Sequence, residues 1–113
     1  MYMKLLTKKI EEAFAKQGDT SNKSSKDIKV ICKFFNPMGA GTWWVYERLE
    51  NDKDIFYCFA LLDDPTFAEL GTISLKEMEA LKLPFGLGIE RDLSFEIGEK
   101  TVQEVIDEVQ GKR

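Results

Sequence analysis

Histidine is absent from this 113-residue sequence, which also holds only two cysteines and three prolines. Without imidazole the chain has no histidine general base, no Cys-His nucleophile and no zinc site that needs histidine. The remaining chemistry belongs to carboxylates, lysine and tyrosine, or to a magnesium site built from oxygen ligands. No constellation of these residue types is recognisable in the sequence, so we assign no catalytic residue, no metal ligand and no cofactor.

Both cysteines lie in apolar, strand-like segments, Cys32 in IKVICKFF and Cys58 in IFYCFALL. Such a setting is typical of small buried side chains, and we expect both to be reduced. No apolar run approaches the roughly 18 residues that a membrane span needs, and the first residues lack the pattern of a signal peptide. The sequence thus predicts a cytoplasmic protein without membrane contact.

Length and composition fit one domain over residues 1–113, because 43% hydrophobic and 32% charged residues are typical of a packed core with a solvated surface. Residues 1–33 hold eight lysines against four acids, whereas the remainder holds eight basic and sixteen acidic residues. A protein that neutralises phosphates usually has a larger basic excess, so nucleic acid is not the favoured partner. The acidic remainder would suit a basic partner.

Three helices are predicted. Thr7 is an N-cap candidate for an amphipathic helix in LLTKKIEEAFAK. Two capping-box patterns, beginning at Ser74 and Thr101, predict a short helix near 75–82 and a C-terminal helix with an apolar stripe. Residues 17–27 lack apolar side chains and are predicted to form a flexible loop.

Strand patterns alternate with short turns in IKVICKFFN, TWWVYERLE, DIFYCFALL and FAELGTIS, and a fifth follows a glycine-containing turn in LPFGLGIERDLSFEI. This order predicts an antiparallel meander. The fold class is therefore α+β, with a mainly antiparallel five-stranded sheet, open or partly barrel-like. In the first strand we expect one face to carry Ile28, Val30, Cys32 and Phe34.

Several strings together resemble a family of short bacterial proteins: MKLLTK, KFFNP followed by TWW, the aspartate after FALL, ELGTISLKEME and GLGIERDLSF. That family, frequent on plasmids, conjugative elements and phages, is a domain of unknown function. The resemblance runs from about Met3 to Phe95 and implies a bacterial, mobile-element setting. It implies no activity, and the C-terminal helix lies beyond it.

A buried ion pair is predicted between Glu47 and Arg91. Alternation along the fifth strand gives one face Ile89, Arg91, Leu93, Phe95 and Ile97, and along the second strand Trp43, Val45, Glu47 and Leu49. Each row contains a single charge. Because a buried arginine needs a carboxylate, we expect the two to pair, as a structural salt bridge or as a ligand anchor.

Trp43 and Trp44 are adjacent on a strand and must face opposite ways, so we expect only one in the core. The other should face solvent or a partner, or lie under a helix or the long loop. Asp63, Asp64 and Glu69 surround Pro65 as an acidic cluster, which is typical of a turn and is also compatible with magnesium or acid–base chemistry. The glycines of PFGLGIE lack the pattern of a nucleotide-binding loop.

Three functions remain open. The first is a non-enzymatic accessory protein of a mobile element that binds a protein partner through an aromatic-bearing sheet face. The second is single-strand nucleic-acid binding, with the lysine-rich first third and Phe35, Trp43 or Trp44 as stacking platforms. The third is a carboxylate-based or magnesium-dependent enzyme, for which Glu47, Asp63, Asp64 and Glu90 should share one cleft.

Overall fold

The computed structural model describes residues 4–111. Its helices are α1 (Lys8–Gln17), α2 (Leu75–Ala80) and α3 (Val102–Gln110), with short 3-10 turns η1 (Pro65–Phe67) and η2 (Pro84–Gly86). Its strands are β1 (Cys32–Phe35), β2 (Thr42–Arg48), β3 (Ile55–Leu61), β4 (Glu69–Ser74) and β5 (Glu90–Arg91). No helix within 4–111 is long and apolar enough to cross a membrane.

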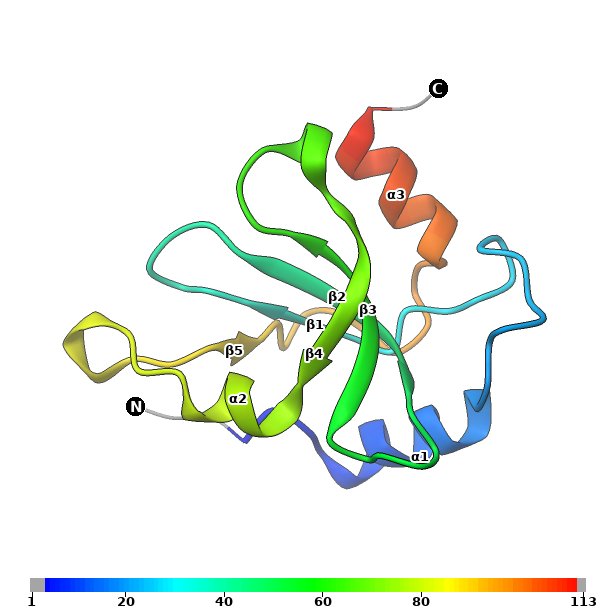
Figure 1. Cartoon of the computed structure of the whole chain (residues 1–113), viewed down its shortest axis with the longest axis horizontal. Helices are drawn as coiled ribbons and strands as arrows, with labels where there is room; N and C mark the ends of the chain where they lie inside the picture. The colour runs from blue at the N-terminus through cyan, green and yellow to red at the C-terminus, as the bar shows by residue number, and fades with distance from the viewer. Residues whose placement is uncertain (1–3, 112–113) are drawn as a thin grey trace.

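The five strands form one antiparallel sheet in the order β4-β3-β2-β1-β5 (Figure 1). Strands β1 to β4 form the predicted meander, and β5 returns beside β1. The sheet is open, because β4 and β5 form its two edges. The predicted α+β class with an antiparallel five-stranded sheet is confirmed, in its open form.

The helices begin where the sequence places their caps. Thr7 accepts a hydrogen bond from the backbone N–H of Ile10, and Ser74 accepts one from Glu77. At α3 the complete capping box is present, because Thr101 and Glu104 each bond the other's backbone N–H. Local sequence therefore determines all three helix starts.

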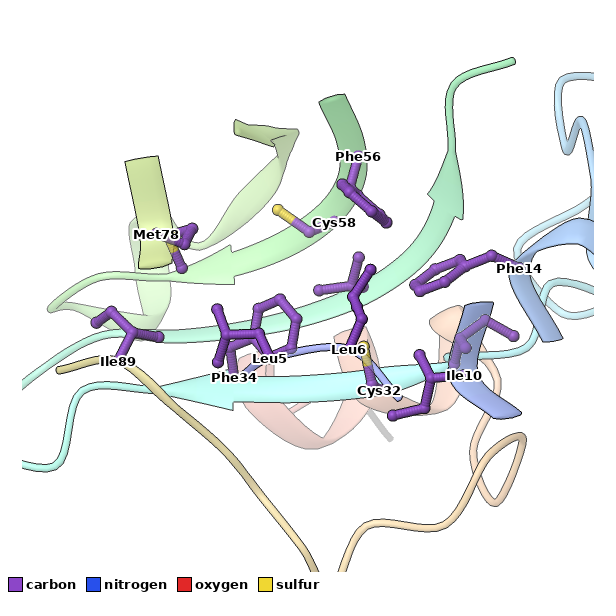
Figure 2. Packing of buried hydrophobic residues seen from close by; sticks show 12 residues of the cluster. Leu5, Leu6, Ile10, Phe14, Cys32, Phe34, Phe56, Cys58, Met78 and Ile89 are labelled. Carbon is purple, nitrogen blue, oxygen red and sulfur yellow. The ribbon is translucent and has the colours of Figure 1, made fainter. Parts of the chain in front are cut away.

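Two cores lie on the two faces of the sheet, and we name them after the helices that cover them. The α1-side core contains Leu5, Leu6, Ile10, Phe14, Ile31, Cys32, Phe34, Val45, Phe56, Cys58, Met78 and Ile89 (Figure 2). The α3-side core contains Ile28, Val30, Tyr46, Phe59, Ala68, Val102 and Val105. In Figure 2 Leu5 lies beside Phe34 and Leu6 beside Cys32, so the segment before α1 also packs on this face of the sheet. The sheet is thus the middle layer.

The first strand is shorter than predicted and its face changes. Ile28 and Val30 pack in the α3-side core, whereas Cys32 and Phe34 pack in the α1-side core. Between them Val30 donates to the Lys100 carbonyl and Ile31 donates to Val45, so the chain leaves one partner for another. The expectation that these alternate residues share one face is wrong, because the consecutive residues Ile31 and Cys32 both pack in the α1-side core and alternation breaks between them.

The fifth strand is also shorter than predicted, since it ends at Arg91. The Asp92 side chain then accepts hydrogen bonds from the backbone N–H and the hydroxyl of Ser94, and the Phe95 N–H bonds the Asp92 carbonyl. This Asx turn replaces the ladder. The predicted alternation from Ile89 to Ile97 therefore does not exist beyond Arg91.

The predicted loop begins after α1, which extends through Gln17. Two of its residues are anchored to the sheet: the Gln17 amide donates to the carbonyls of Lys29 and Tyr46, and Thr20 bonds Glu47. Further turns fill the segment as far as Asp27. Its flexibility stays a prediction.

Candidate functional site

Glu47 owes its position to a bulge in β2. Val45 pairs with Cys58 but Glu47 pairs with Tyr57, so Tyr46 is the extra residue. A bulge places two residues opposite one and breaks alternation. Trp43 and Val45 lie on the α1 side and Trp44 and Tyr46 on the α3 side, as regular alternation requires, and the bulge interrupts this alternation only before Glu47. The predicted row from Trp43 to Leu49 therefore holds for Trp43 and Val45 and is broken between Val45 and Glu47.

The Glu47 side chain is only 8% exposed. Its Oε1 accepts hydrogen bonds from the Thr20 backbone N–H at 3.0 Å and from the Thr20 hydroxyl at 2.5 Å. Thr20 is itself buried. The loop after α1 therefore delivers both donors to this carboxylate.

Arg91 lies elsewhere and has different partners. It pairs in register with Phe34, which in turn pairs with Trp43 on β2, roughly 13 Å along the strand from Glu47. Its Nη1 donates to the carbonyls of Lys4 and Leu5 at 3.0 and 2.7 Å. The predicted Glu47–Arg91 pair is wrong, because Arg91 instead fastens the segment before α1 to the edge strand β5.

The two tryptophans face opposite sides of the sheet, as predicted. Trp43 packs on the α1-side core and Trp44 on the α3-side core, with its ring 6.1 Å from that of Phe59. The Lys33 ammonium lies 5.5 Å from the Trp44 ring and 3.5 Å from Asp92. Both indoles are half-buried. The expectation that only one joins a core is wrong, because helices cover both faces.

The carboxylates predicted as an enzyme centre lie apart. Asp63 and Asp64 are exposed between β3 and η1, and Asp64 caps η1 through the Thr66 N–H. Glu90 lies on β5, which is one edge of the sheet, whereas Asp63 and Asp64 lie in the connection to β4, which is the other edge. Within residues 4–111, no three carboxylate or thiol side chains are grouped so as to hold a metal.

Three exposed apolar side chains belong to the segment that leads from β3 into β4, whereas Phe85 and Leu93, at 88% and 73% exposed, lie on either side of β5 in the sequence. Leu62, Phe67 and Leu70 are 60%, 78% and 53% exposed. Asp63, Asp64 and Glu69 are exposed between them in the sequence. We call these six residues the β4 edge surface. In Figure 1 it lies around η1 and the start of β4, beside the end of α3, where the Gln110 amide donates to the Ala68 carbonyl.

A groove of about 1460 Å³ runs between α1, the following loop and the β2–β3 turn. We call it the Glu47 groove; its lining includes Ala15, Gly18, Asp19, Thr20, Tyr46, Glu47, Glu50, Lys53 and Tyr57. Across one end, Arg48 pairs with Glu11 at 2.9 Å and packs over the Phe56 ring. In Figure 1 α1 lies beside the β2–β3 turn at the bottom of the view.

Burial controls the titration of the groups near the sheet centre. It raises the pKa of Tyr46 to about 12, with further contributions from Cys58, Glu47 and Tyr57. It also raises the pKa of the Cys58 thiol to about 12, and that of Cys32 well above its usual range, although Arg91 partly opposes the second shift. Both thiols are free and buried. Neither is therefore an activated nucleophile.

Sequence reasoning did not single out the exposed residues Leu62, Phe67 and Leu70, or Thr20 and Tyr57 beside Glu47. The exposure of the three apolar residues could have been predicted, because apolar residues interleaved with acids around Pro65 are poor candidates for burial. Thr20 and Tyr57 had no such signal, since their proximity to Glu47 depends on the bulge and on where the loop returns.

The fold and sites define a small α+β domain with an open antiparallel sheet covered on both faces. The family model described as "Protein of unknown function (DUF2958)" matches residues 5–110, and the chain belongs to that family. The match includes α3, so the C-terminal helix is not an extension outside it. Searches of curated proteins and of solved structures found no match.

Proposed function

We propose that this protein is a non-enzymatic interaction module that binds an extended segment of a partner protein along the edge of β4. The observation that carries the proposal is the β4 edge surface. Three large apolar side chains stand in solvent there, beside an edge strand of six residues. Exposed apolar groups on such an edge mark a place where another chain can add.

The backbone favours an extended ligand. Among residues 4–111, β4 pairs with β3 alone, so its outer side presents N–H and C=O groups to solvent. An added strand would satisfy these groups, and Phe67 and Leu70 would supply apolar contacts for its side chains. This is the physical logic of β-strand addition.

Charge favours a basic segment. Residues 54–75 contain Asp54, Asp63, Asp64 and Glu69 and no lysine or arginine. A partner segment that carries both apolar and basic side chains would complement this surface, because unlike charges steer the encounter and fix the register. This refines the predicted protein partner, and moves its site from the aromatic sheet face to the edge.

The two alternatives have less support. Trp43 and Trp44 face opposite sides of the sheet, so they do not form one stacking platform for a nucleic-acid strand. Glu47, Asp63 and Glu90 do not share a cleft that would serve an enzyme. The setting that we propose is a bacterial mobile element, on the resemblance, and the cytoplasm, because Cys32 and Cys58 are free thiols.

Selection from a phage-displayed library of random peptides tests the proposal. We expect enrichment of peptides that combine lysine or arginine with apolar residues. Leu70→Lys should abolish their binding, whereas the matched control Leu93→Lys, at an even more exposed leucine beyond β5, should leave it unchanged. Enrichment of acidic peptides, or equal binding to the Leu70 variant, would sink the proposal.

A further inference from the structure

The Glu47 groove contains a carboxylate that is buried without a cationic partner. Within residues 4–111, the ion pairs are Lys33–Asp92, Arg48–Glu11 and Lys100–Glu108, and Glu47 takes part in none of them. Taking a carboxylate out of water is costly unless a cation or several donors compensate. Thr20 supplies two donors and no charge. The site is therefore electrostatically incomplete.

One carboxylate oxygen is available to the groove. Both hydrogen bonds to Glu47 end on Oε1. No side-chain oxygen of the described residues that is cut off from solvent lacks a hydrogen-bond partner. Oε2 must therefore reach solvent, and Glu47 lines the groove. Thr20 fixes the side chain, so this oxygen is presented in one orientation.

The surroundings add negative potential and an aromatic surface. Apart from the Arg48–Glu11 ion pair, the charged residues that line the groove are three acids, Asp19, Glu47 and Glu50, and one base, Lys53. The last turn of α1 also lines it, through Ala15, and a helix C-terminus carries partial negative charge.

Tyr57 completes the site. It is 38% exposed, pairs in register with Glu47, and its ring stacks on Tyr46 at 6.3 Å. A cation that sits beside Glu47 and over the face of the Tyr57 ring would be attracted by it, because the face carries the negative end of the ring quadrupole. Such an aromatic neighbour adds to the binding of an organic cation.

We propose that the Glu47 groove binds a primary aliphatic ammonium group, as carried by a lysine side chain or a linear diamine. The geometry selects ammonium over guanidinium. A guanidinium binds best as a fork on two carboxylate oxygens, and here Thr20 already occupies Oε1, which leaves one acceptor for a point charge. The site is independent of the β4 edge surface, so either proposal can fail alone.

Titration of isotopically labelled protein, followed by amide chemical shifts, tests this site. The probes are a blocked lysine, cadaverine, a blocked arginine and a blocked Nε-acetyl-lysine. We expect saturable shifts at Thr20 and Tyr57 with an ammonium probe, several-fold weaker binding of arginine and none of acetyl-lysine. Tighter binding of blocked lysine than of cadaverine would assign the ligand to a protein side chain, and the reverse to a free amine.

Three variants complete the test. Glu47→Gln, which keeps an acceptor for Thr20, should weaken ammonium binding about tenfold or more. Tyr57→Leu should weaken it about two- to fivefold at an exposed position where folding is tolerant. The control Glu77→Gln, at an exposed position on α2 outside the groove, should leave ammonium binding unchanged. The proposal is overturned if no ammonium probe saturates, if acetyl-lysine binds equally well, or if the folded Glu47 and Tyr57 variants both bind like the parent.

Discussion

Replacement of Arg91 by methionine tests how the segment before α1 is held. The Arg91 Nη1 group donates to the carbonyls of Lys4 and Leu5, and Leu5 is 0% exposed. Methionine keeps much of the side-chain stem and removes both donors. The bond to Leu5 is partly buried and the other is exposed, so we expect a loss of about 2–3 kcal/mol in the free energy of unfolding.

At roughly 2.1 cal/mol/K per residue, that loss lowers the melting temperature by about 8–13 °C. Urea unfolding gives the free energy, and calorimetry gives the temperature. A double-mutant cycle with Glu47→Gln adds a sharper criterion, because distant residues with different partners should be additive within about 0.5 kcal/mol. A coupling energy above about 1 kcal/mol, or an unchanged stability of Arg91→Met, would refute the reasoning.

Three further predictions concern α3 and Tyr46. Val105→Ala, at a side chain 1% exposed, should cost about 1.5–3 kcal/mol in urea unfolding, whereas Glu108→Gln, which removes only an exposed ion pair with Lys100, should stay within about 0.5 kcal/mol. Thr101→Ala should cost about 1 kcal/mol and Thr101→Ser much less, because serine preserves the cap. The pKa of Tyr46 is raised from 10.0 to about 12, so the stability it contributes is complete below pH 10 and falls between pH 10 and about 12. Tyrosinate absorbance should lose its highest step in Tyr46→Phe, and a Tyr46 that ionises near pH 10 would contradict the burial argument.

Local signals determined most of the fold. Thr7, Ser74 and Thr101 each cap a helix through a side chain whose partner lies three residues away, and such pairs are visible in the sequence. The meander was predictable for the same reason, since short turns separate alternating segments. Structure that depends on residues a few positions apart can be predicted from the sequence.

The sites depended on features without a local pattern. The bulge at Tyr46 turns Glu47 to face Tyr57, and nothing in TWWVYERLE distinguishes a bulged strand from a regular one. The Asx turn at Asp92 ends β5, although the residues that follow still alternate. Simple alternation therefore predicted the wrong face for part of β2 and of the segment after β5. The predicted Glu47–Arg91 ion pair rested on those faces and was wrong with them. Periodicity predicts a face only as far as the strand stays regular.

Amide hydrogen exchange with and without a library-selected basic peptide tests the central claim, that β4 is the edge to which a partner adds. The account predicts that the peptide slows exchange in Glu69–Ser74 more than anywhere else, and that Leu70→Lys abolishes this protection while Leu93→Lys preserves it. Protection confined to β5, to the Glu47 groove or to the strand around Trp43 and Trp44 would contradict it.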